Sequence, residues 1–331
     1  MIILGIESTA HTFGIGIIKA TKSKCTILAN VRANFTTEEG GMIPSKVAQH
    51  HIDVSDKTLQ EALSTAKINL KKIDLIAYSQ SPGIGHCLRI GAVFARTLAQ
   101  KLKKPIIGVN HCIAHLEIGR IMTKAKDPVL LYVSGANTQI IAYEGKRYRI
   151  IGETLDGGIG NFLDSFAREL KLGFPGGPKI EALAKKSKNY IELPYAVKGM
   201  DLTFSGILTQ LKRKNAEGTY TKEDLCYSAQ ETVFAMVIEV AERAMAHCNK
   251  KELLLGGGVA CNKQLQRMAQ KMCKERNAKC YMVENQLNVD NGVMIAWLGF
   301  EMYRIKKRGT PLSKADIQPY VRTDEVKVFW R

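Results

Sequence analysis

The sequence lacks three features that would assign it to other classes of protein. No uncharged apolar run approaches the roughly 18 to 20 residues that a membrane-spanning helix needs, since even the opening segment Ile2–Ile6 is followed at once by Glu7. No basic stretch precedes that segment and no small-residue cleavage site follows it, which argues against a secretory signal peptide. None of the eight cysteines forms a CxxC pair, which excludes zinc-ribbon and dithiol redox motifs. We therefore expect a soluble, cytoplasmic protein without a membrane partner, whose thiols are mostly buried and reduced.

Two common nucleotide-binding motifs and a balance of charge are also missing. The absence of Walker A and GxGxxG patterns argues against P-loop and Rossmann nucleotide binding. Only 31 Asp and Glu residues oppose 48 Lys and Arg residues, which leaves a net charge of +17. This surplus favours a polyanionic partner such as nucleic acid, and the alternative is the lysine-rich surface of a thermophile or acidophile.

Strand and helix signals alternate along the 331 residues, a length that usually forms two domains or lobes. Hydrophobic spacing predicts a hairpin over 2–18, a strand over 26–33, helices over 45–66 and 89–102, and a strand over 73–78. The strand, polar turn and strand over 129–143 repeat the pattern of the N-terminus. The repeat indicates an internal duplication with a boundary near 123–127, the alternative being two unrelated hairpins.

The strongest local signal is a pair of histidines four residues apart. His111 and His115 would lie on one face of a helix, close enough to share a cation, and they stand in an apolar stretch where an unpaired imidazole is costly to bury. Surface decoration is the alternative for such a spacing. A third ligand must come from elsewhere, and Asp290, at the start of a later apolar helix, is a candidate that could instead cap that helix.

The same helix does not carry the pattern of a metallopeptidase. That chemistry needs Glu directly after the first histidine as general base, and Cys112 stands there instead. Glu117 would point away from the face that carries the histidines. Peptide hydrolysis therefore lacks its base.

Small and glycine-rich turns follow several of the predicted strands. The turn at 256–258 precedes a predicted helix beginning near Asn262, and backbone amides there could face an anion, with the Asn262 side chain free for hydrogen bonding. The turn at 134–138 suits close approach by a ligand, and the turn at 174–178 would place Gly177 beside the same pocket. Each of these could also be an ordinary turn.

Taken in order, the motifs resemble the TsaD family over nearly the whole chain. The matching segments are GIEST (5–9), NHCIAH (110–115), YVSG (132–135), DGGIG (156–160), FPGGP (174–178), TFSG (203–206), GGGVA (256–260) and DNG (290–292). The closing RTDEV (322–326) is similar to the archaeal and eukaryotic branch, whose members are the catalytic subunits of the KEOPS complex.

This resemblance implies an α/β fold of the actin, Hsp70 and sugar-kinase (ASKHA) type, with two duplicated lobes around a nucleotide cleft. We expect the first lobe to comprise residues 1–125 with 298–331. The second lobe would comprise 126–297 and carry a mostly helical insertion around 160–230.

The resemblance also implies an acyltransferase that moves a threonylcarbamoyl group from threonylcarbamoyl-adenylate to N6 of adenosine 37 in tRNAs reading ANN codons. His111, His115 and Asp290 would hold one divalent metal, iron rather than zinc, with Tyr132 as a further candidate ligand. ATP or the adenylate would occupy the cleft. No general base can be named from the family pattern. The implied adenylate-binding residues are Tyr132, Val133, Ser134, Gly135, Ala136, Asp164, Gly177, Glu181 and Asn262.

The implied partners are tRNA and the KEOPS subunits, including a small protein kinase and a small dimerising subunit. Ala136 departs from the family, which usually has glycine at this turn position, so the turn must adjust if the position requires a positive φ. The alternative functions are an ASKHA-type ATPase and a nucleotide-binding scaffold without transfer chemistry of its own.

Overall fold

Both halves of the chain build a five-stranded mixed sheet with the same strand order. In the computed structural model, which describes residues 1–38 and 42–331, the first sheet contains, in spatial order, β3 (Lys24–Asn34), β2 (Thr12–Thr21), β1 (Ile2–Glu7), β4 (Leu75–Ser81) and β5 (Ile106–Asn110). The second contains β8 (Arg147–Glu153), β7 (Thr138–Glu144), β6 (Val129–Val133), β11 (Glu252–Gly256) and β12 (Lys279–Met282). In each sheet the first three strands pair antiparallel and the last two are added in parallel. The shared topology confirms the predicted duplication and fold class.

Two long helices cover the outer face of the first sheet, α1 (Pro44–Ala66) and α2 (Gly85–Leu102), with the short 3-10 turn η1 (Leu70–Lys72) between them in sequence. Pro44 suits the first turn of α1 because it needs no amide partner there. The buried residues of both helices join β1, β2 and β4 in one hydrophobic core. These helices lie close to the ranges predicted from hydrophobic spacing, although α2 begins four residues earlier, at Gly85.

Between β8 and β11 the second half contains a mostly helical segment. Its elements are α4 (Ile159–Glu169), α5 (Gly177–Ala184), β9 (Val197–Lys198), β10 (Asp201–Leu202), α6 (Ser205–Glu217) and α7 (Lys222–His247). Helix α7 is buried over most of its length and contacts β6, β7 and β8. After β11, the 3-10 turn η2 (Gly258–Cys261) leads into α8 (Lys263–Glu275), which packs against α7 and β12.

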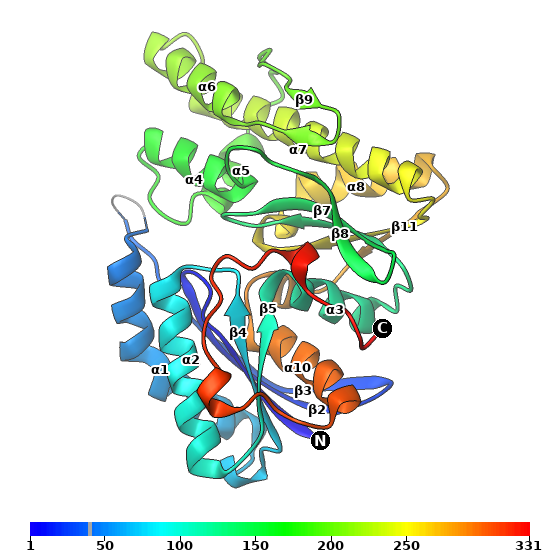
Figure 1. The fold of residues 1–331 in the computed structure, drawn as a ribbon. Coiled ribbons are helices and arrows are strands. Elements are labelled where there is room, and N and C mark those ends of the chain that lie inside the picture. The colour runs from blue at the N-terminus through cyan, green and yellow to red at the C-terminus, as the bar shows by residue number, and fades with distance from the viewer. Residues whose placement is uncertain (39–41) are drawn as a thin grey trace.

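The two halves exchange helices. Helix α3 (His111–Thr123) follows β5 of the first sheet, where it contacts β3, β4 and β5, and also packs against β6, β11 and β12 of the second. Helix α10 (Gly292–Lys306), preceded by the short α9 (Asn285–Asn288), follows β12 of the second sheet but packs against β1, β2 and β4 of the first (Figure 1). The two exchanged helices contact each other, and their N-termini meet between the halves.

The C-terminal segment, with the 3-10 turns η3 (Leu312–Lys314) and η4 (Thr323–Glu325), crosses both halves. In the first half, Tyr78 donates a hydrogen bond from its hydroxyl to the carbonyl of Asp316 at 3.0 Å. In the second half, Arg322 pairs with Glu153 at 2.7 Å. The chain then ends beside α3, where Trp330 is buried.

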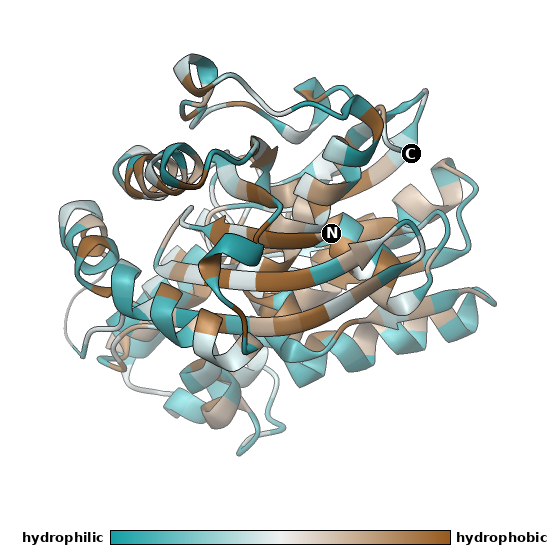
Figure 2. Ribbon diagram, turned by 90° about the horizontal axis from the view of Figure 1, so that it is seen from below, coloured by the Kyte–Doolittle hydropathy of each residue, from teal (hydrophilic) through white to brown (hydrophobic). Residues whose placement is uncertain are grey.

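Apolar residues gather on the strands of both sheets, while the surrounding helices carry hydrophilic residues as well (Figure 2). The division into 1–125 with 298–331 and 126–297 stays a prediction; α10, which begins at Gly292, packs with the first sheet over its length. No helix in the described part of the chain is both long and apolar enough to cross a membrane.

A buried histidine in α1 gives the fold a specific dependence on pH. His51 lies edge-on to Phe13 with ring centroids 5.5 Å apart. Burial lowers the pKa of His51 from 6.5 to about 4, and the neighbouring His50 and His11 act in the same direction. The unfolded chain therefore takes up a proton at His51 that the folded protein excludes. This contribution to stability is intact above about pH 6.5 and falls by about 3 kcal/mol as the pH drops toward 4.

We expect His51→Leu to flatten the pH profile of stability, measured as the free energy of urea unfolding across that range of pH. Because His50 and His11 interact with His51, the difference between wild type and variant measures His51 together with its coupling to these two histidines. Parallel profiles for the two proteins would show that His51 is not responsible.

Candidate functional site

The N-terminus of α3 presents the two histidines predicted as ligands. Asn110 caps the helix, since its Oδ1 accepts a hydrogen bond from the amide of Ile113 at 3.1 Å. His111 is the first residue of the helix and His115 lies one turn later on the same face, with ring centroids 4.8 Å apart. Both are buried. The helical spacing inferred from the sequence is therefore confirmed.

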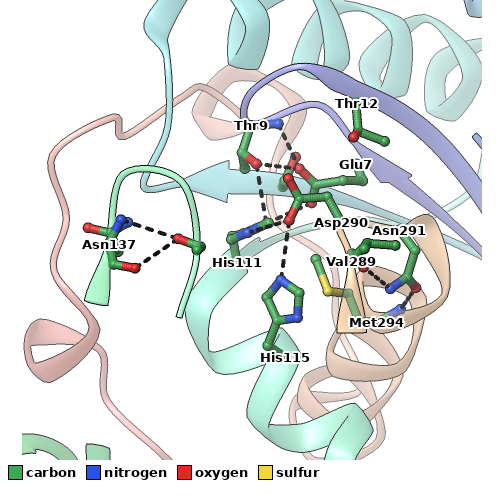
Figure 3. A network of polar contacts seen from close by, with 12 residues as sticks. Glu7, Thr9, Thr12, His111, His115, Asn137, Val289, Asp290, Asn291 and Met294 are labelled. Atoms are coloured by element: carbon green, nitrogen blue, oxygen red, sulfur yellow. Dashed lines mark hydrogen bonds and ion pairs between the residues drawn. The ribbon is translucent and has the colours of Figure 1, made fainter. Parts of the chain in front are cut away.

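Asp290 faces this pair from the N-terminus of α10 (Figure 3). Its Oδ1 lies 3.3 Å from Nε2 of His111 and 3.4 Å from Nε2 of His115. The cap of α10 is Asn291, whose Oδ1 accepts a hydrogen bond from the amide of Met294 at 3.0 Å. The interpretation of Asp290 as the helix cap is therefore wrong, and its carboxylate is directed at the histidines.

Close packing of backbone on backbone brings Asp290 to this position. A Cβ at Gly292 would lie 2.1 Å from the amide nitrogen of Gly16 and 2.5 Å from the carbonyl oxygen of Gly5. Glycine at all three positions lets the first turn of α10 rest directly on β1 and β2. The DNG motif thus combines a side chain that faces the histidines, a helix cap and a contact that only glycine permits.

The electrostatics of the three residues are strongly coupled. Burial would lower the pKa of His111, but Glu7 and Asp290 outweigh it and hold this pKa well above its ordinary value. Burial lowers the pKa of His115, and the hydrogen bond to Asp290 offsets this only in part. Burial would raise the pKa of Asp290, yet the two imidazoles hold it well below its usual range. The site therefore combines a protonated His111 with a neutral His115 and an ionised Asp290, and binding of a cation would release the proton from Nε2 of His111.

The donor set fits a divalent cation. The nitrogen and oxygen atoms offered by His111, His115 and Asp290 all lie within 4.8 Å of one another. Two imidazoles and one carboxylate leave further coordination positions open. Tyr132, the further candidate ligand, is buried beside them with its ring centroid 5.2 Å from that of His115. Burial raises the pKa of its hydroxyl well above the ordinary value.

Glu7, at the end of β1, is a member of this cluster to which the sequence assigned no role. Its Oε2 lies 2.9 Å from Nδ1 of His111, and its Oε1 accepts hydrogen bonds from the amide of Thr9 at 2.7 Å and the Thr9 hydroxyl at 2.5 Å (Figure 3). The available signal was an acidic residue ending an otherwise apolar, buried strand, because a carboxylate in that setting needs a partner.

The end of β6 and the turn after it carry four of the predicted adenylate-binding residues, Val133, Ser134, Gly135 and Ala136. Val133 ends the strand, and Gly257, at a φ of 93°, fits so closely that a Cβ there would lie 2.4 Å from the Val133 carbonyl oxygen. The carbonyl groups of Ser134 and Gly135 accept hydrogen bonds from the amides of Gly160 and Asn161, at 3.0 and 2.9 Å. The turn is thereby fixed to the N-terminus of α4.

Ala136 is exposed in this turn and does not have a positive φ. The adjustment that a left-handed conformation would require is therefore not needed. Alanine is compatible with the backbone of the turn.

The remaining predicted residues line the neighbouring helix ends. Asp164 on α4 accepts a hydrogen bond from the amide of Gly176 at 2.7 Å, and burial raises its pKa. Gly177 begins α5, and Glu181 on the same helix accepts a hydrogen bond from the amide of Lys263 at 3.3 Å. These contacts join α4, α5 and the start of α8 into one wall of the second half.

Asn262 differs from expectation because its side chain is already engaged. Its Oδ1 accepts hydrogen bonds from the amides of Gln264 and Leu265 at the start of α8, and its Nδ2 donates to Gln230 Oε1 at 2.6 Å. The side chain is thus used as a helix cap and an internal contact. Its free availability to a ligand, inferred from the sequence, is not what the structure shows.

Glu117 points away from the histidines, as the sequence predicted. It is buried, and its carboxylate accepts hydrogen bonds from the Tyr148 hydroxyl, from Trp330 Nε1 at 2.8 Å and from Arg120 Nη1 at 2.8 Å. These contacts anchor the C-terminal segment to α3. Glu117 is therefore a structural residue and not a base for the metal site.

Proteins of known fold resemble this chain over most of its length. HypF from T. kodakarensis aligns with a TM-score of 0.65 at 15% identity, covering 92% of this chain and 48% of HypF. Component A of the Acidaminococcus fermentans (R)-2-hydroxyglutaryl-CoA dehydratase aligns with a TM-score of 0.58 at 15% identity, covering 92% and 99%. At such identities the likeness concerns the fold, which is of the ASKHA type.

Sequence comparison gives a more specific result. The profile of the TsaD family, described as tRNA N6-adenosine threonylcarbamoyltransferase, matches residues 26–297. Proteins of that name from Thermococcus sibiricus and Homo sapiens are 54% and 49% identical, over 100% and 99% of both chains. A probable bifunctional tRNA threonylcarbamoyladenosine biosynthesis protein of Methanosarcina mazei is 51% identical, and the match covers 99% of this chain and 59% of that protein. The chain therefore belongs to the TsaD family.

Proposed function

We propose that His111, His115 and Asp290 hold one divalent cation, and that this centre serves threonylcarbamoyl transfer from threonylcarbamoyl-adenylate to adenosine 37 of tRNAs reading ANN codons. As a member of its family, the chain is a transferase that acts on N6 of an adenosine in tRNA. The observation that carries the finer proposal is the meeting of the three side chains where the exchanged helices begin.

The proposed site uses residues from both halves of the chain, some to hold the cation and others to orient the adenylate. A bound cation would supply Lewis-acid stabilisation of charge that develops on the donor. The turn at 134–137 and the wall formed by Asp164, Gly177 and Glu181 would orient the adenylate, because attack by a weakly nucleophilic amine depends on positioning. We propose that the backbone at Val133, Gly135, Ala136 and Asn262 shapes the surface that receives the adenylate. Tyr132 would lie beside the cation.

We propose iron rather than zinc, since two histidines and one carboxylate with open positions are the usual donor set of non-haem Fe(II). The bifunctional name of the Methanosarcina mazei relative supports a second protein acting with this chain. We propose that KEOPS subunits, among them a small protein kinase and a small dimerising subunit, accompany it in the cytoplasm. The net charge of +17 supports contact with tRNA.

The proposal is tested by combining the purified chain and its partner subunits with threonylcarbamoyl-adenylate and an unmodified ANN-decoding tRNA. Mass spectrometry of the digested RNA is expected to show threonylcarbamoyl adenosine that depends on both donor and tRNA. An otherwise matched tRNA that reads GNN codons serves as the control. Steady ATP turnover without tRNA or donor would indicate an ATPase instead. Binding of tRNA without any product would indicate a scaffold.

A further inference from the structure

We propose that Glu7 is a positioning residue of the metal centre, which fixes the ring of His111 so that its Nε2 faces the cation. This inference rests on the proposed function, because it concerns the same site. It assigns a role to a carboxylate that lies behind one histidine, on the side opposite Asp290.

The geometry specifies which nitrogen of His111 is available to a metal. A carboxylate only accepts hydrogen bonds, so the contact of 2.9 Å between Glu7 Oε2 and His111 Nδ1 requires the proton on Nδ1. Nε2, which lies 3.3 Å from Asp290 Oδ1, is then the atom that can coordinate once its proton has been released. Glu7 thus selects the tautomer as well as the orientation of the ring.

Glu7 is itself held in place. Its side chain is fully buried, and Thr9 donates two hydrogen bonds to Oε1, from the amide and from the hydroxyl. One oxygen is therefore occupied by Thr9, and the other is left for His111.

The burial of this charge supports a role at the metal. Within the described residues, Glu7 forms no ion pair with a lysine or arginine, and the group beside its Oε2 is the imidazole of His111. Burying a carboxylate that has no lysine or arginine beside it destabilises the fold. The position of Glu7 therefore indicates that its contact with His111 serves the site. His115 offers a contrast within the same site, because its buried Nδ1 has no hydrogen-bond partner among the described residues. Among the described residues, the hydrogen bond at Nδ1 is therefore present at His111 and absent at His115.

The test measures binding of Co²⁺, added alone to the metal-free chain, by its visible absorption and by competition with a chelating indicator. Glu7→Gln keeps the size of the side chain but replaces the carboxylate with an amide. We expect it to weaken Co²⁺ binding by about 10- to 100-fold and to shift the absorption bands, as outer-shell carboxylates do at other sites. Glu7→Asp, which keeps the charge on a shorter side chain, is expected to act in the same direction, and it serves if Glu7→Gln does not fold.

Thr12→Val is the matched control. Thr12 is a buried residue of the adjacent strand whose hydroxyl donates to Asn34 Oδ1 at 3.0 Å, and this change should leave Co²⁺ binding at the wild-type value. Unchanged tRNA affinity and a cooperative unfolding curve would show that the Glu7 variants are folded.

If Glu7→Gln binds Co²⁺ with an affinity within about twofold of wild type, the expected loss of about 10- to 100-fold is absent. That result would overturn the role of Glu7. Equal Co²⁺ binding by His111→Ala and wild type would overturn it as well, because the cation would then not be at His111. Formation of modified adenosine by the wild type, measured in the same preparations, separates these failures from a failure of the transfer function itself.

Discussion

His115→Ala is expected to abolish threonylcarbamoyl transfer, lowering the rate by about 100-fold or more, because the loss of one of three ligands removes several kcal/mol of transition-state stabilisation. His115 is a better choice than His111 for this change. His111 also pairs with Glu7, so its removal would leave this fully buried carboxylate without its partner as well. The Nδ1 of His115 has no partner among the described residues, and its removal disturbs the surrounding contacts least.

The measurement is the rate at which modified adenosine forms on an ANN-decoding tRNA, together with the metal content of the purified variant. Affinity for tRNA should stay at the wild-type value, since His115 is buried at the start of α3. His247→Ala, at the exposed end of α7, is the matched control and should leave the rate unchanged. Transfer by His115→Ala at a rate comparable to wild type would refute the role of the cation.

Gly292→Ala is expected to destabilise the protein by more than about 4 kcal/mol, because the new methyl group would meet backbone atoms that cannot move independently. Its Cβ would lie 2.1 Å from the Gly16 nitrogen and 2.5 Å from the Gly5 oxygen. The start of α10 would have to move away from the sheet and carry Asp290 away from the histidines. Stability and cation binding should therefore be lost together.

The free energy of urea unfolding and Co²⁺ binding measure the two losses. Gly206→Ala is the matched control, because a Cβ at Gly206, in the first turn of α6, meets nothing within 4 Å. Its stability should stay within about 1 kcal/mol of wild type, since alanine is favoured over glycine in a helix. A Gly292→Ala protein as stable as Gly206→Ala would mean that the contact between α10 and the sheet is not tight.

The parts of the site that were predictable from sequence depend on local spacing or on repeated pattern. Histidines four residues apart in an apolar stretch share a helical face wherever that helix packs. The repeated hairpin likewise indicated two equivalent sheets. Asp290 could be proposed as a ligand, but its neighbour Asn291 is an equally suitable cap, and only the structure shows which of the two side chains faces the helix amides.

Features that depend on long-range packing were out of reach. The contact between Glu7 and His111 joins residues 104 positions apart, so no local pattern contains it. The engagement of Asn262 by Gln230 depends on how α7 lies beside α8. The exchange of α3 and α10 between the sheets follows from the path of the chain through both halves. The hydrophobic pattern of each helix shows that it is buried, but not against which sheet.

The exchange of helices has a consequence for biosynthesis. The first sheet is complete once β5 has left the ribosome, yet α10, which covers the face opposite α1 and α2, is made only after the second half. Until then this face of β1, β2 and β4 lacks its covering helix. Docking of α10 onto the first sheet must therefore follow synthesis of the second half, and until then the nascent chain exposes apolar surface on that sheet.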